Sequence, residues 1–183
     1  GSVPCHVIRM EEGQITTRDI TVTDICQDDL EGNGILQKIA VVERHRGTGM
    51  TGVGFVKGFG LRCGAAASSV SHDSHNIIVI GDNDEDMELA VRELIRTQGG
   101  YTLIEKHQVY ETLELPIMGL MTDMGFEKAN EKLERMIRKA HEMGVPGGMD
   151  PFIALSFMAL PVIPEIRITP RGIYSVTDST FYR

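Results

Sequence analysis

The spacing of apolar residues changes several times along this chain, and each spacing predicts a different element. Residues 35–43 are rich in isoleucine and valine and are typical of a buried strand. Two more apolar runs, 65–70 and 77–80, flank a polar segment and predict a pair of strands. Between 87 and 95 the apolar residues recur at every third or fourth position, which predicts a helix with one buried face.

The ends of that helix and the elements after it also have recognisable signals. Asn83 is a preferred N-cap residue, and the acids at 84–86 fall in the first turn, where the helix dipole favours them. A hairpin is expected at 101–105 and 109–115, because two short apolar strands are separated by a few polar residues. A second helix is expected at 126–143, where apolar residues again follow a helical period.

Both ends of the chain predict shorter strands. In residues 1–34, apolar and polar residues alternate only weakly and apolar side chains are few. This segment is therefore expected to form either an edge ribbon or a connection from an upstream part. Strands are also expected at 165–168 and 173–176. The central order, ββαββα, predicts an α+β layered fold with a largely antiparallel sheet and helices packed on it. We therefore expect a connecting segment at 1–34 and one domain at 35–183.

Composition narrows the class of partner. The net charge of −8 and an aromatic content of 5% give neither a basic stripe nor interleaved aromatic residues, so a nucleic-acid partner is not expected. No apolar run reaches the ~18 residues of a membrane helix, so no membrane partner is expected. The scattered cysteines Cys5, Cys26 and Cys63 indicate free thiols and a cytoplasmic location.

The densest cluster of reactive side chains is His72-Asp-Ser-His-Asn76, between the two apolar runs of a strand pair. A functional interpretation gives the histidines a proton-transfer role, with Asp73 orienting one of them. The alternative is a structural turn in which Asp73, Ser74 and Asn76 satisfy backbone donors. A third ligand to complete a metal site around His72 and His75 is not apparent nearby.

Two neighbouring segments have weaker signals. The glycine-rich stretch 52–60 resembles a phosphate-binding loop only loosely, and a tight connection packed by Phe55 and Phe59 is the favoured interpretation. Lys57 within it is a candidate to meet an anion or a neighbouring domain. The charged run 43–46 ends a predicted strand and is interpreted as a solvated or domain-facing edge.

Six further stretches share a pattern with a known family when they are taken in order: 39–45, 52–60, 72–81, 83–87, 115–120 and 150–161. Together they resemble the C-terminal domain of the adenine deaminase family within the amidohydrolase superfamily. Residues 6–24 resemble, more loosely, the segment with which such enzymes leave their barrel.

The resemblance implies a parent enzyme that converts adenine and water to hypoxanthine and ammonia in a barrel with a divalent metal, manganese or iron. Such a barrel needs ~250 residues, and this chain has no H-x-H motif. No catalytic residue and no metal ligand is therefore assigned to this chain, no cofactor is expected in it, and it is expected to be inactive alone. Its expected partners are the barrel, adenine and further copies in a homo-oligomer.

The role of the domain itself stays open between three hypotheses. In the first, His72, Asp73, His75 and Asn76, with Lys57, lie near the purine and help to enclose or orient it. In the second, the chain is a structural module that packs on the barrel and builds the oligomer. In the third, it is an independent domain that binds a small ligand.

Overall fold

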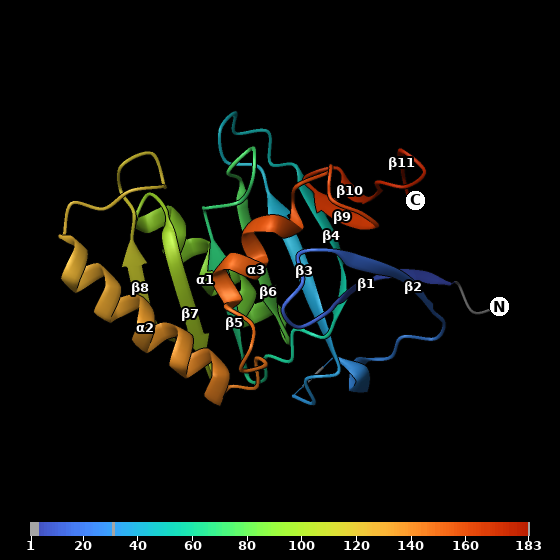
Figure 1. Cartoon of the computed structure of the whole chain (residues 1–183), viewed down its shortest axis with the longest axis horizontal. Helices are drawn as coiled ribbons and strands as arrows, with labels where there is room; N and C mark the ends of the chain where they lie inside the picture. The colour runs from blue at the N-terminus through green and yellow to red at the C-terminus, as the bar shows by residue number, and fades with distance from the viewer. Residues whose placement is uncertain (1–3, 31, 183) are drawn as a thin grey trace.

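The computed structural model describes residues 4–30 and 32–182, and most of the strands form one mixed sheet (Figure 1). Eight strands follow the order β2-β1-β4-β3-β6-β5-β7-β8, and every neighbouring pair is antiparallel except β1 and β4. The strands are β1 (Cys5–Met10), β2 (Thr17–Val22), β3 (Leu36–Val42), β4 (Thr51–Lys57), β5 (Gly64–Ser68), β6 (Ile77–Gly81), β7 (Gly100–Glu105) and β8 (Gln108–Glu114).

Three α-helices and a small second sheet complete the fold. The small sheet has the order β11-β10-β9, and a 3-10 helix follows β2. The bounds are η1 (Gln27–Asp29), α1 (Asp84–Arg96), α2 (Phe126–Glu142), α3 (Pro151–Met158), β9 (Ile166–Thr169), β10 (Gly172–Ser175) and β11 (Thr180–Phe181). The structure therefore confirms an α+β fold, with the predicted ββαββα order in β5, β6, α1, β7, β8 and α2.

The large sheet has a different cover on each face. Ile39 and Val41 of β3 point into a core shared with α2, α3 and the small sheet, whereas Ala40 points into a core shared with α1. This alternation follows from the two-residue period of a strand. Figure 1 shows α2 and α3 crossing the near face of the sheet. The hairpin of β1 and β2 lies at one edge of the sheet, as the edge-ribbon interpretation predicted.

Two elements differ from the sequence expectation. The segment at 51–57 is strand β4 and not a tight connection, and its glycines lie where β9 and β10 cross close above it. Helix α3 was not predicted, because its apolar residues do not follow one face. Asp150 caps it by accepting from the backbone N–H groups of Phe152 and Ile153, and Pro151 occupies its first turn.

Among residues 4–30 and 32–182, no helix combines the length and the apolar character needed to cross a membrane.

Candidate functional site

Residues 71–76 belong to the connection between β5 and β6 and form a polar loop that we call the histidine loop. Val42 pairs with Ile77, so the loop lies at the same end of the sheet as the connection between β3 and β4. Both connections stand at the top of the molecule in Figure 1, beside the segment between β8 and α2. Three segments that are distant in sequence therefore meet around the two histidines.

Backbone hydrogen bonds fix the position of His75. Its N–H donates to the carbonyl oxygen of Ser71 at 2.6 Å, and its ring Nδ1 accepts from the N–H of Ser71 at 3.2 Å. Because Nδ1 accepts, this bond favours the neutral tautomer with its proton on Nε2. His72 packs edge-on against His75, with ring centroids 5.4 Å apart, and stacks on Phe157 of α3 at 5.3 Å.

Arg44 connects the histidine loop to its surroundings. Its Nε donates to the carbonyl oxygen of His75 at 2.8 Å, and its Nη2 donates to that of Met118 at 2.6 Å. Its backbone N–H donates to Oδ1 of Asn76 at 3.2 Å. The guanidinium lies against Gly119, where a Cβ would approach it to 2.4 Å, so a larger residue would displace it. Arg44 therefore clamps two loops to the end of β3.

The surroundings lower the pKa of His75. Partial burial is the largest cause, because it penalises the charged imidazolium, and His72 and Arg44 add repulsion. The pKa of Arg44 is also lowered by burial. A neutral His75 with an Nε2–H donor is therefore the expected form near pH 7.

The other predicted site residues are Asn76, Asp73 and Lys57, and each has a different environment. Asn76 is buried and holds the turn, because its Nδ2 donates to Oγ of Ser74 at 3.1 Å. Asp73 is exposed, and in the part of the chain that the structure describes it makes no hydrogen bond to either histidine, so its predicted orienting role is not seen.

The structure separates Lys57 from the other predicted site residues. Lys57 pairs with Leu36 at the opposite end of β3 from Val42, which adjoins the histidine loop. Seven strand residues separate the two ends, a span of about 20 Å. A ligand the size of adenine cannot contact Lys57 and the histidine loop together.

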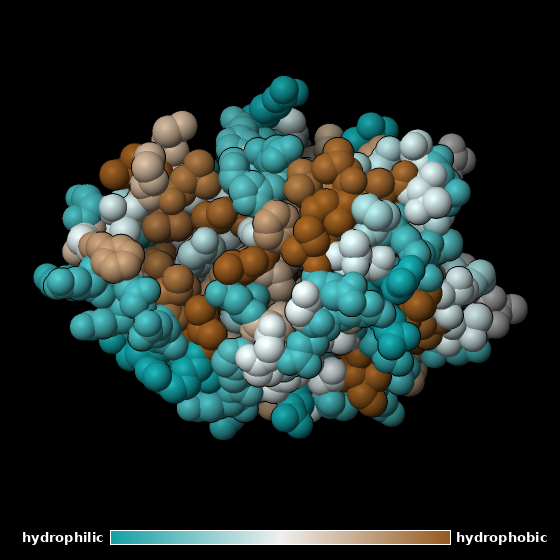
Figure 2. Space-filling view, in the orientation of Figure 1, coloured by the Kyte–Doolittle hydropathy of each residue, from teal (hydrophilic) through white to brown (hydrophobic). Residues whose placement is uncertain are grey.

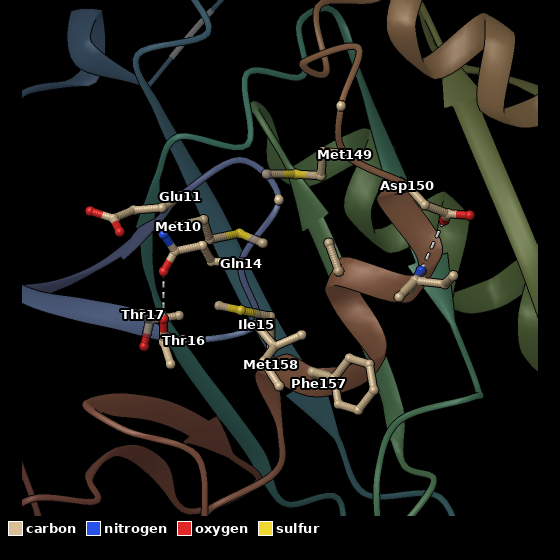
Figure 3. A pocket seen from close by; sticks show the side chains of 14 residues that line it. Met10, Glu11, Gln14, Ile15, Thr16, Thr17, Met149, Asp150, Phe157 and Met158 are labelled. Carbon is tan, nitrogen blue, oxygen red and sulfur yellow. Dashed lines mark hydrogen bonds between the residues drawn. The ribbon is translucent and has the colours of Figure 1, made fainter.

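A slot runs along α3 (Figure 3). It lies between the β1–β2 connection and the segment that ends in α3, and its volume is about 200 Å³. We call it the methionine slot, because Met10, Met149 and Met158 line it together with Ile15, Ile153 and Phe157. Phe157 belongs to both features, since one face of its ring stacks on His72.

Arg44 and Phe157 were missed as site residues. Arg44 belongs to the charged run interpreted as an edge, and the sequence carries no signal that its guanidinium turns back onto two loops. Phe157 lies in an apolar stretch without a helical period. Neither contact is local in sequence, since Arg44 and His75 are 31 positions apart.

The described residues do not fit the divalent metal that the resemblance implies. Across 4–30 and 32–182, no three histidine, cysteine, aspartate or glutamate side chains gather as they would around an ion. His72 and His75 are adjacent, but the exposed Asp73 does not complete a ligand set with them.

Relatives match this chain along nearly its whole length. Residues 14–180 match the family described as adenine deaminase C-terminal domain. A protein from Desulfitobacterium hafniense named adenine deaminase is 53% identical over 98% of this chain and 32% of its own length. Proteins of the same name from Clostridium acetobutylicum and Bacillus subtilis are each 44% identical, over 97% and 93% of the chain. The chain spans about a third of the length of these relatives.

Proposed function

Because the chain belongs to the adenine deaminase C-terminal domain family, we propose that it serves an enzyme that hydrolyses adenine to hypoxanthine and ammonia. In this proposal the histidine loop lies beside the purine. The chemistry takes place in the two thirds of the relatives' length that this chain does not span. A divalent ion bound there, manganese or iron, would activate the attacking water.

The observation that carries this role is the fixed, neutral state of His75. A hydrogen bond from Ser71 occupies Nδ1, and this leaves Nε2–H free to donate to an acceptor such as a purine ring nitrogen. The lowered pKa keeps the ring in that state near neutral pH. Because Arg44 and Phe157 hold the loop from two sides, the donor is positioned before any ligand arrives.

Exposed apolar side chains on both sides of the histidine loop support contact with another domain. Ile153 and Val162 lie on the α3 side, with 56% and 70% of their surface exposed, and Met118 lies on the other side with 74% exposed. Figure 2 shows apolar side chains gathered on this face of the molecule. Apolar surface around a polar centre is typical of an interface that surrounds a functional site.

The test is adenine turnover by the full-length enzyme that carries this domain. We expect His72→Ala with His75→Ala to lower kcat/KM roughly 100-fold, about tenfold for each lost hydrogen bond or ring contact. His107→Ala is the matched control, because His107 lies at the other end of the sheet, 3.1 Å from Asp86. The control is expected to retain activity, and metal content is expected to be equal in all three proteins.

Other outcomes separate the alternatives. A folded double variant with full activity would contradict the proposed role and favour a structural or oligomerisation module. Turnover by the 183-residue chain alone would contradict the placement of the chemistry outside it.

A further inference from the structure

A second cleft borders the histidine loop, between the β3–β4 connection and the turn that joins β9 to β10. Its volume is about 620 Å³. We call it the arginine cleft, because Arg46 lines it from the first of these segments and Arg171 from the second. Ser74 and Asn76 of the histidine loop also line it. A ligand in this cleft would therefore adjoin the histidine loop.

The guanidinium groups of the arginine cleft have no acidic partner in the described part of the chain. Four other arginines each form an ion pair with a glutamate: Arg18, Arg92, Arg96 and Arg135. Within residues 4–30 and 32–182, Arg46 and Arg171 make no ion pair. The cleft is therefore a place where a chain of net charge −8 presents positive charge.

Glu43 also lines the cleft, but its own loop binds its carboxylate. Oε1 accepts from the N–H of Arg46 at 2.8 Å, and Oε2 accepts from the N–H and the hydroxyl of Thr48 at 3.1 Å and 3.0 Å. The bond from the N–H of Thr48 is the largest cause of the lowered pKa of Glu43, which is about 2. Nε2 of His45 donates to the carbonyl oxygen of Ser74 at 2.6 Å. These bonds fix the loop that carries Arg46.

Arg171 is held by its neighbours in the small sheet. Its guanidinium lies over the ring of Phe181, 4.4 Å from the centroid. Its backbone N–H donates to Oγ1 of Thr169 at 3.1 Å. A guanidinium that stacks on a ring keeps the N–H donors at its edge for an anion. Both arginines therefore belong to segments that are ordered before a ligand binds, which lowers the entropic cost of binding.

The remaining lining includes an apolar part, formed by Met50, Pro170 and Phe181. Small-molecule sites have volumes of roughly 300–1,000 Å³, and this cleft is in that range. We propose that the arginine cleft binds a small phosphate monoester that carries an aromatic ring. Such a phosphate has a charge of about −2 and three acceptor oxygens for the two guanidinium groups. The ring would pack against the apolar side chains, with favourable contact to the sulfur of Met50.

The experiment is an NMR titration of the 15N-labelled 183-residue chain with phenyl phosphate. The backbone amide resonances of Arg46, Ser74 and Arg171 are expected to shift in a saturable way. Inorganic phosphate lacks the ring and is expected to bind about fivefold more weakly. Benzoate has one charge and two oxygens, and it is expected to bind about threefold more weakly. Phenol has no charge and is expected to give no saturable shift.

Two variants remove one guanidinium each, Arg46→Gln and Arg171→Gln. Each is expected to weaken the binding of phenyl phosphate roughly tenfold, because hydrogen bonds to a charged group are lost. Arg138→Gln is the matched control, because Arg138 is an exposed residue of α2 that does not line the cleft. It changes the net charge of the chain by the same amount and is expected to leave the affinity unchanged.

The absence of saturable shifts with phenyl phosphate would overturn the proposal. Equal weakening by all three substitutions would also overturn it, because binding would then reflect only the general charge of the chain. Benzoate or phenol binding as tightly as phenyl phosphate would reject the phosphate as the recognised group. The titration involves no turnover, so its result and the result of the histidine variants are independent of each other.

Discussion

Arg44 shows why single residues of a site are hard to find in a sequence. The cluster 72–76 was identifiable because its reactive side chains are consecutive and lie between two strands. The contacts of Arg44 come from two segments that are distant in sequence, 75–76 and 118, and the register of β3 with β6 brings the first of them to Arg44. The distance of Lys57 from the histidines was hidden in the sequence for the same reason, because it depends on the direction of β4.

At this scale we predict that Arg44→Gln raises the pKa of His75 toward its ordinary value of 6.5. The variant removes a repelling charge, although burial, His72 and His45 still lower the pKa and Asp73 still raises it. Two lost guanidinium bonds should also cost roughly 1–2 kcal/mol of unfolding free energy. An NMR titration of His75 measures the first effect, and chemical denaturation measures the second.

The pH dependence has a definite sign. The pKa of His75 is lower in the folded chain than in the unfolded chain, so its contribution to stability is fully present above pH 6.5 and is lost as the pH falls below it. Arg44→Gln should make this loss smaller. Arg92→Gln is the control, because Arg92 pairs with Glu88 on the surface of α1. An unchanged pKa of His75 in Arg44→Gln would contradict Arg44 as one source of this repulsion.

Elements with a clear period were predictable, and elements shaped by contacts were not. The helices α1 and α2 have an apolar face, and the hairpin of β7 and β8 is local, so their sequences indicate them directly. Helix α3 is apolar on most sides and lacks a period. Strand β4 contains Gly52 and Gly54, which normally weaken a strand but here allow the small sheet to lie against it.

We predict that Gly52→Ala destabilises the chain by about 1–3 kcal/mol. An added Cβ would meet the carbonyl oxygen of Thr169 and the backbone nitrogen of Gly172, at 1.9 Å and 2.6 Å, and backbone atoms cannot rotate away as a side chain does. Gly147→Ala is the control, because nothing lies within 4 Å of its Cβ position. Denaturant midpoints compare the two, and equal stability of both variants would show that the small sheet does not depend on this approach.

The whole molecule has one face that combines the histidine loop, the methionine slot and exposed apolar residues. In the described part of the chain, the opposite face of the sheet carries α1 and has neither the histidine loop nor the methionine slot. In the proposed function, this face lies against the part of the enzyme that the chain does not span. The fold could be predicted from the sequence largely by its local periods, whereas this face is assembled from segments between residues 10 and 162.

The measurement that tests this arrangement most directly is a crystal structure of the full-length enzyme with adenine bound. We predict that Nε2 of His75 lies within about 3.5 Å of a purine atom, in hydrogen-bond range. We also predict that Met118 and Val162 are buried against the remainder of the enzyme. A histidine loop that faces solvent, with no atom in contact with the purine, would contradict the account.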